Sequence, residues 1–322
     1  MSSPARCPVI RFAPLYQERV WGGRYLESLY GRKLPDQEAL YGESWEICDR
    51  PEAQSVVLEG KFEGWTLNDL WQKARAEVFG SRYRDHGAGR FPLLIKILDA
   101  RQNLSVQVHP DDRTAPLLKG EAKSEAWFVS HAIPQATLYA GLLEGTTPKE
   151  YSDSVADGTL MDHVNTLEVQ AGDCLYIPGG TLHAIGAGLV IFEIQQNSDT
   201  TYRVFDWNRP GLDGKPRELH KEQSLQALNF DLPPCLPQRL ENNRVFEGLY
   251  FSLSQSNLKL SEEFILPNED RFFIGAVVFG EVSMEGERLR AGDFFLIPAP
   301  QNAELRSVTA NSEEASVLWI SL

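Results

Sequence analysis

The chain has 322 residues, the length of about two domains, and 42% hydrophobic and 24% charged residues are ordinary for a globular protein. Its 45 acidic and 31 basic residues give a net charge of −14, which argues against a nucleic-acid or anionic-membrane surface, because either needs a basic stripe. The longest wholly apolar run, residues 272–279, is far shorter than the ~18 residues of a membrane helix. With no apolar signal region at the start and four widely spaced cysteines, we expect a cytoplasmic protein with reduced thiols. The cysteines are Cys7, Cys48, Cys174 and Cys235.

Most of the chain is expected to form short β-strands bounded by turn residues. The expected strands are 54–59, 93–99, 104–109, 125–130, 174–178, 189–195, 272–278 and 293–298. Helical periodicity is confined to 66–79, which opens with a Thr-x-x-Asp cap, and to 147–164 and 218–228. Many strands with few helical insertions predict a β-sandwich or barrel and not a βαβ fold. Neither common phosphate-binding glycine loop occurs.

One segment recurs after 120 residues, at 171–178 and at 291–298. In both copies a Gly-Asp turn leads into a strand that ends at a proline, which indicates a duplicated β-barrel module. The copies then diverge, since His183 in the first stands opposite Ala303 in the second, so only the first is expected to hold a metal. We place the boundary near Pro233-Pro234, which gives a metal-binding catalytic domain at 1–235 and a smaller domain without metal ligands at 236–322.

Polar residues that can bind a metal follow three of the expected strands. Strand alternation puts Gln107 and His109 on one face, Glu125 lies on the next strand, and His183 follows a third. Two imidazoles, a carboxylate and an amide oxygen suit a divalent transition metal. Spacing alone favours the simpler alternative, in which this polar face is a solvated strand surface.

The other histidines and two tryptophans are expected to have structural roles and not to belong to a functional site. Four histidines lie in turns, at a strand end or on helical stretches, where a surface or hydrogen-bonded role is usual. They are His86, His131, His163 and His220. Trp21 and Trp45 are expected mainly in the core.

Several motifs together carry a family resemblance. Four residues follow the spacing of the second cupin motif: Gly172, Pro178, Gly180 and His183. Ala187 stands where that motif usually ends in Asn, and Gln107-x-His109 stands where the first motif usually has His-x-His. Further matching segments are 20–23, 42–46, 94–96, 107–112, 123–127, 182–186 and 193–206. The chain therefore resembles the type I phosphomannose isomerases, particularly their short bacterial form, over about residues 8–225.

This resemblance implies a mostly β fold, a cupin-type β-barrel or jelly roll with helical insertions and a second, smaller cupin-like domain. It also implies a zinc-dependent isomerase that interconverts mannose 6-phosphate and fructose 6-phosphate through a cis-enediol. The zinc ligands it implies, for one Zn²⁺ per chain, are Gln107, His109, Glu125 and His183. As partners we expect a small sugar phosphate, with no nucleic acid and no membrane, and a monomer or homodimer.

The resemblance also makes Arg203 the active-site arginine, whose fixed charge can stabilise an enediolate or hold a phosphate. Lys123 is the second catalytic candidate, as a cation or as the proton carrier, if the metal and burial lower its pKa. Ser105 and Glu193 are expected to bind substrate. The group that takes the proton stays open among Lys123, Glu193 and a metal-bound water.

Two other functions compete with the isomerase. A non-catalytic metal-binding cupin could sense a sugar or sugar phosphate, but it needs no proton carrier, so Arg203 together with Lys123 favours the enzyme. A cupin dioxygenase usually places three or more imidazoles around iron, and this site offers two.

Overall fold

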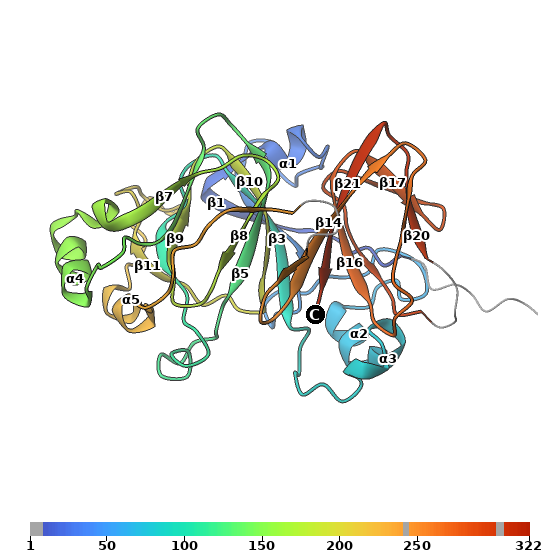
Figure 1. Cartoon of the computed structure of the whole chain (residues 1–322), viewed down its shortest axis with the longest axis horizontal. Coiled ribbons are helices and arrows are strands. Elements are labelled where there is room, and N and C mark those ends of the chain that lie inside the picture. Colours follow the sequence, from blue (N-terminus) through green and yellow to red (C-terminus); the bar gives the residue numbers. More distant parts are fainter. Residues whose placement is uncertain (1–8, 241–244, 301–305) are drawn as a thin grey trace, which may run out of the picture.

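Two β-sandwiches lie side by side in the computed structural model, which describes residues 9–240, 245–300 and 306–322 (Figure 1). Each sandwich consists of two antiparallel sheets. The structure confirms the predicted mostly β fold, with a jelly-roll arrangement of strands and a few helical insertions. Across the described residues, no helix combines the length and apolar character needed to cross a bilayer.

The first sandwich contains a sheet of seven strands and a sheet of five. In spatial order the seven are β1 (Leu15–Gly23), β2 (Tyr41–Ile47), β3 (Leu93–Ala100), β10 (Leu189–Gln196), β5 (Glu125–Ala132), β8 (Asp173–Ile177) and β12 (Gln238–Arg239). The five are β11 (Tyr202–Phe205), β4 (Val106–Val108), β9 (Leu182–Ile185), β6 (Thr137–Leu142) and β7 (Val164–Glu168).

The second sandwich repeats this plan with fewer strands. Its five-stranded sheet has the order β13 (Val245–Glu247), β14 (Ser252–Lys259), β21 (Glu314–Ser321), β16 (Phe273–Phe279) and β19 (Phe294–Ile297). Its four-stranded sheet has the order β15 (Glu263–Ile265), β20 (Ser307–Ala310), β17 (Glu281–Met284) and β18 (Glu287–Arg290). The order β3-β10-β5-β8 thus recurs as β14-β21-β16-β19, as expected for a duplicated module.

The recurring Gly-Asp turn has the same local structure in both copies. Gly172 and Gly292 have φ angles of 92° and 85°, a left-handed conformation that favours glycine. Each donates its N–H at 2.8 Å to a valine carbonyl of the neighbouring strand, Val129 or Val277. Ala303, the residue expected opposite His183, lies outside the described residues, and the division at 235/236 stays a prediction.

The two sandwiches are joined by short backbone contacts. Residues 238–239, just before the chain enters the second sandwich, form β12 and pair with β8 as the last strand of the first sandwich's sheet. Near the N-terminus, Ile10 forms an antiparallel bridge with Leu296 of β19.

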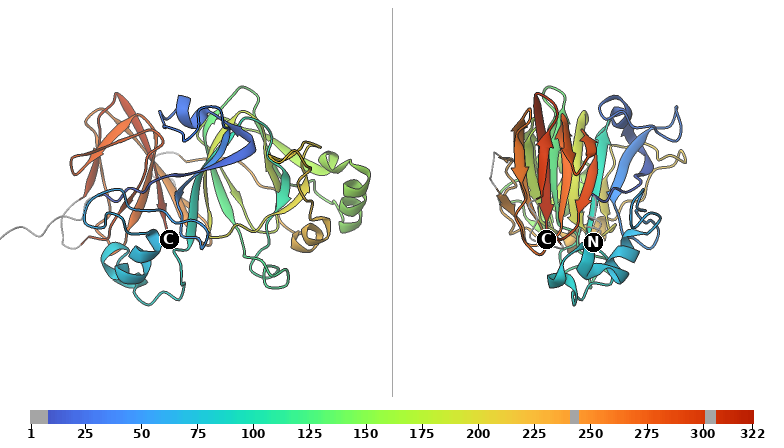
Figure 2. Two further views of the ribbon diagram at one scale, coloured as in Figure 1. Left: turned by 180° about the vertical axis from the view of Figure 1, so that it is seen from behind. Right: turned by 90° about the vertical axis from the view of Figure 1, so that its right-hand side faces the viewer.

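The helices are short and lie at the edges of the sandwiches (Figure 2). They are α1 (Tyr25–Ser28), α2 (Leu67–Lys73), α3 (Arg75–Val78), α4 (Pro148–Asp157) and α5 (Lys221–Ala227), with 3-10 turns η1 (Ser81–Tyr83) and η2 (Leu160–His163). The predicted cap is confirmed, because Thr66 Oγ1 accepts the Asp69 N–H at 3.0 Å and starts α2.

The predicted helices are longer than those in the structure. The helix predicted over 66–79 breaks at Ala74, whose φ of −126° is not helical, and so divides into α2 and α3. The helix predicted over 147–164 ends at Gly158, which has a left-handed φ of 85°. The third begins at Lys221 instead of residue 218, because the His220 N–H is hydrogen-bonded to the Arg203 carbonyl of β11.

The strand predicted over residues 54–59 is wrong. This segment makes isolated bridges only, because its successive backbone groups bond to different parts of the chain. Ser55 donates its N–H to Cys48, whereas the Val57 N–H bonds to the Trp65 carbonyl. The strand predicted over 104–109 is shorter than expected, at Val106–Val108.

The seven-stranded sheet is apolar on one face and carries polar groups on the other. In β10, Phe192 and Ile194 belong to a buried cluster shared with the second sandwich, whereas Glu193 between them faces the opposite side. The Phe192 ring packs edge-on against Phe294 of β19 at a centroid separation of 4.9 Å. The second sandwich therefore supports the sheet from which the polar groups project.

We predict that Phe192→Ala lowers the free energy of unfolding by about 3–5 kcal/mol, because it leaves a cavity between the two sandwiches. Urea unfolding followed by tryptophan fluorescence measures the change. Phe279→Ala is the control, since Phe279 is 42% exposed and its loss should change stability by no more than about 0.5 kcal/mol. Equal losses in the two variants would contradict a shared core.

Candidate metal centre and adjoining pocket

Strand register brings residues from three strands of the five-stranded sheet into one row. Gln107 of β4 lies directly opposite His183 of β9 on one side and Arg203 of β11 on the other. Directly opposite residues of antiparallel strands project on the same face. Arg203, Gln107 and His183 therefore face the interior of the first sandwich together, although 96 positions separate the first two in sequence.

A second row faces them from the seven-stranded sheet. Lys96 of β3 lies opposite Glu193 of β10, and Glu193 lies opposite Trp127 of β5. Glu125 precedes Trp127 by two residues on β5 and so projects on the same face.

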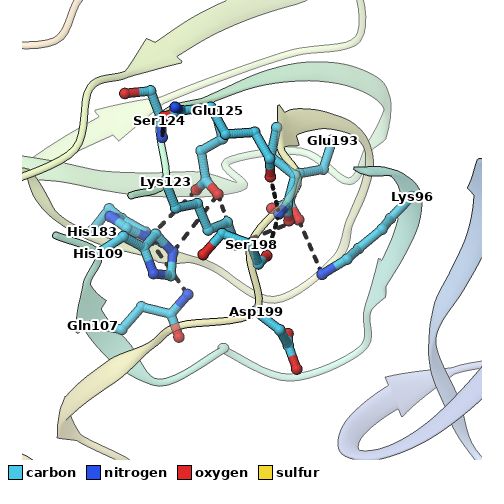
Figure 3. Close-up of polar contacts among 12 residues, drawn as sticks. Lys96, Gln107, His109, Lys123, Ser124, Glu125, His183, Glu193, Ser198 and Asp199 are labelled. Carbon is cyan, nitrogen blue, oxygen red and sulfur yellow. Dashed lines mark hydrogen bonds and ion pairs between the residues drawn. The ribbon is translucent and has the colours of Figure 1, made fainter. Parts of the chain in front are cut away.

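A group of three buried side chains forms where the two rows meet (Figure 3). His109, Glu125 and His183 place their candidate ligand atoms within 4.8 Å of one another. The two Nε2 atoms are 3.1 Å apart. His183 Nε2 lies 3.4 Å from Glu125 Oε1, and His109 Nε2 lies 3.7 Å from Glu125 Oε2.

Backbone carbonyls fix the two imidazoles with their Nε2 atoms directed inward. His109 Nδ1 is 2.8 Å from the Thr200 carbonyl, and His183 Nδ1 is 2.8 Å from the Thr181 carbonyl. A carbonyl only accepts, so each Nδ1 carries the proton and each Nε2 presents a lone pair. Burial lowers the pKa of both rings, that of His183 to about 4, which keeps them neutral. Two imidazole lone pairs therefore converge on the carboxyl group of Glu125, and this set of donors fits a divalent cation.

Gln107 lies beside this group. Its Nε2 is 3.4 Å from His183 Nε2, and its Oε1 lies 3.2 Å from Ser105 Oγ, which can donate to it. A half-turn of the side-chain amide exchanges the oxygen and nitrogen positions, and this choice is an assignment from the hydrogen-bond network. After such a turn the amide oxygen faces the cluster, so Gln107 could be a fourth ligand.

Charges of alternating sign extend outward from the metal group, and Figure 3 shows those nearest to it: Glu125, Lys123, Glu193 and Lys96. Lys123 Nζ is 3.0 Å from Glu125 Oε2 and 3.9 Å from Glu193 Oε1. Lys96 Nζ is 3.6 Å from a carboxylate oxygen of both Glu193 and Glu43. Arg19 completes this chain, since its Nε lies 2.8 Å from Glu43 Oε1. Each buried charge in it therefore has an opposite charge beside it.

The two proton-carrier candidates respond differently to this environment. Burial alone lowers the pKa of Lys123, but Glu125 and Glu193 outweigh it and the net shift is upward. Burial therefore gives no net lowering of the pKa of Lys123, because two carboxylates face its ammonium group. Burial raises the pKa of Glu193, while Lys123 and Lys96 limit the rise.

A cavity of about 560 Å³ opens beside the metal group. Its wall brings together five of the residues expected in the site: Ser105, Gln107, Lys123, Glu193 and Arg203. Arg203 is held in it by a 3.3 Å hydrogen bond from its Nε to Ser105 Oγ and a 3.1 Å bond from Nη1 to the Glu218 carbonyl.

Other residues of the same wall were not predicted from the sequence, including Lys96, Glu43 and Arg19. A charged Lys96 within the apolar run of residues 93–98 was the signal that could have found one of them. His220 was expected in a structural role, and its Nδ1 does accept the Arg203 N–H at 3.2 Å, but it also lines the cavity.

Comparisons with known proteins match one family over most of the chain. A family model described as phosphomannose isomerase type I, catalytic domain, matches residues 9–153. Mannose-6-phosphate isomerase ManA of Bacillus subtilis is 37% identical over 303 residues, covering 89% of this chain and 92% of that protein. Mannose-6-phosphate isomerase of Streptococcus mutans is 36% identical, covering 87% and 89%. The crystal structure of the mannose 6-phosphate isomerase from Bacillus subtilis has a TM-score of 0.85 and 29% identity, covering 98% of this chain and 99% of that one.

We predict that the purified protein holds about one divalent ion per chain and that His109→Ala or Glu125→Ala removes it. Gln107→Ala should keep more metal than either, because water can replace a neutral amide oxygen more easily than an imidazole or a carboxylate. Metal analysis by plasma mass spectrometry after dialysis measures the occupancy. Equal loss in all three variants would contradict this order, and two ions per chain that are both lost in His183→Ala would contradict a single site.

Proposed function

Because this chain belongs to the family of type I phosphomannose isomerases, we propose that it is a mannose-6-phosphate isomerase, which interconverts mannose 6-phosphate and fructose 6-phosphate. The observation that carries the proposal is the buried group of His109, Glu125 and His183, which lies beside a pocket containing Lys123, Glu193 and further charged side chains. The substrate is a small sugar phosphate. A cytoplasmic location and a monomeric or homodimeric state stay predictions from the sequence.

Zinc is the metal that we propose for the site, one ion per chain. Its ligands are His109, Glu125, His183 and, after a turn of its amide, Gln107. Neutral imidazoles with a carboxylate suit Zn²⁺, which prefers nitrogen and oxygen donors at four positions. When bound, zinc supplies a Lewis acid that polarises the sugar carbonyl without redox chemistry of its own.

The reaction moves a proton between C2 and C1 of the sugar through a cis-enediol. We assign the proton transfer to the Glu193 carboxylate, because a buried carboxylate with a raised pKa is a stronger base than an exposed one. Lys123 and Lys96 flank it, with their Nζ atoms 3.9 Å and 3.6 Å from Glu193 Oε1. Lys123, whose pKa is raised, stays protonated and donates hydrogen bonds to substrate oxygens.

Arg203 stabilises the charge that develops on the enediolate oxygens. Its guanidinium lies one strand away from Gln107, and Ser105 and the Glu218 carbonyl hold two of its nitrogens. A donor that is already oriented costs no reorganisation when charge develops, which makes it effective in the transition state. Ser105 therefore acts in substrate binding through Arg203 as well as by facing the pocket.

A coupled assay tests the proposed function. We expect the metal-loaded protein to convert mannose 6-phosphate into fructose 6-phosphate, detected through glucose-6-phosphate isomerase and a dehydrogenase. Removal of the metal with a chelator should abolish turnover, and addition of Zn²⁺ should restore it. Lack of turnover by the zinc-loaded protein would contradict the proposal and favour a non-catalytic sugar-phosphate sensor.

Arg203→Ala separates transition-state stabilisation from simple binding. We expect kcat to fall by about 10²–10³ with zinc still bound, because a preorganised donor to developing charge is lost. Arg203→Lys should also be badly impaired, since lysine keeps the charge but lacks the planar pair of donors. Steady-state kinetics with metal analysis decide the question, and near-normal turnover in both variants would contradict the assignment.

A further inference from the structure

Three guanidinium groups gather near the Asp206 carboxylate, and two of them, those of Arg203 and Arg217, line the pocket. Asp206 directly follows β11 and pairs with Arg217 through two hydrogen bonds, Nε to Oδ2 at 2.7 Å and Nη2 to Oδ1 at 2.6 Å. Asp206 Oδ1 also accepts Arg209 Nη2 at 3.0 Å. Among the described residues, no carboxylate forms an ion pair with Arg203. The cluster of Arg203, Arg209, Arg217 and Asp206 therefore has an excess of positive charge.

This excess distinguishes the cluster from the rest of the cavity wall. The ammonium groups of Lys96 and Lys123 each face two glutamates, and Arg19 pairs with Glu43, so their charges are compensated. Three other carboxylates line the cavity: Glu18, Asp199 and Asp213. These three carboxylates repel an anion, so the arginine cluster is the favourable position for an anion in this cavity. Burial lowers the pKa of Arg203, and Arg217 and Arg209 lower it further, as expected for like charges held close together.

The fold places Arg217 in the wall of the same cavity as Gln107 and Arg203. β11 is the outermost strand of its sheet, next to β4, so Arg203 lies about 4.8 Å from the Gln107 row. After β11 the chain forms a loop, closed by a bridge between Pro210 and Pro216, that returns Arg217 to the cavity wall. A substrate whose carbonyl carbon faces the metal group can thus extend towards Arg217.

We propose that Arg217 binds the phosphate group of the substrate and that Asp206 is the positioning residue that holds its guanidinium in place. This inference rests on the proposed function for the identity of the anion. Arg217 donates hydrogen bonds from Nε and Nη2 to Asp206. Within the described structure, Nη1 is therefore the nitrogen that remains to donate to the phosphate. A guanidinium oriented by a carboxylate suits phosphate, because planar donors match its oxygens and little side-chain freedom is lost on binding.

The roles of the two arginines then differ. Arg203 is fixed through Ser105 and the Glu218 carbonyl beside the metal end, where charge develops during the reaction. Arg217 contacts a phosphate whose charge does not change, so it binds the ground state and the transition state equally. Loss of such uniform binding raises KM and leaves kcat nearly unchanged.

Arg217→Ala tests this division. We expect KM for mannose 6-phosphate and the dissociation constant for inorganic phosphate, measured by calorimetry, to rise about 10- to 100-fold, as for a lost charge-assisted hydrogen bond. The value of kcat and the zinc content should stay near those of the wild type. Asp206→Asn should weaken phosphate binding less, because Arg217 keeps its charge but loses its orientation.

Arg288→Ala is the matched control, since Arg288 is 71% exposed on the second sandwich, and it should leave both constants unchanged. Wild-type KM and phosphate affinity in a folded Arg217→Ala variant would overturn the inference. If that variant does not fold, Arg217→Gln decides in the same way, because glutamine removes the charge but keeps part of the side chain. A wild-type protein that binds phosphate through Arg217 but does not turn over mannose 6-phosphate would overturn the proposed function and leave the anion site standing.

Discussion

Two imidazole nitrogens and a carboxyl group share one buried space, and the surrounding structure depends on this arrangement. The carbonyls of Thr181 and Thr200 accept hydrogen bonds from Nδ1 of His183 and His109. Neither ring can therefore rotate to move its Nε2 away from the carboxylate. The Glu125 carboxylate is fully buried, and a charged carboxylate in such a position requires positive charge nearby. A divalent ion meets that requirement directly, and Lys123 meets part of it from the side.

The buried charges farther from the metal group also need an opposite charge beside them. Lys123 needs a second carboxylate, which Glu193 provides, and Lys96 and Glu43 extend the alternation to Arg19 near the surface. Such a series can be buried only on a rigid support, because each pair must keep its distance. Phe192 and Phe294 supply that support by packing the back of the sheet against the second sandwich. The chemistry of one sandwich thus relies on the packing of both.

Strand alternation predicted the β class and placed Gln107 and His109 on one face, but the metal group of His109, Glu125 and His183 and the role of Arg203 were expected from the family resemblance. The structure brings the three metal candidates together and places Lys123, Glu193 and Arg203 in the pocket beside them. The sequence patterns could not predict Arg217 or Glu43, because these residues reach the pocket through a loop and through the pairing of β2 with β3. The net effect of burial and neighbouring charge on the pKa of Lys123 also could not be predicted, since the number of carboxylates facing an ammonium group depends on tertiary structure. Helix ends failed where one residue, such as Ala74 or Gly158, has a non-helical backbone angle.

The repeated Gly-Asp turn bears on how such a protein can be engineered. Gly172 and Gly292 make the same turn with φ angles of 92° and 85°, yet within the described residues the metal group is built on the first copy alone. The backbone geometry that shapes each sandwich is therefore separable from the side chains that form the metal group. The second sandwich offers an independent scaffold of matching topology, on which a designer could install a new ligand set while the original centre keeps its support.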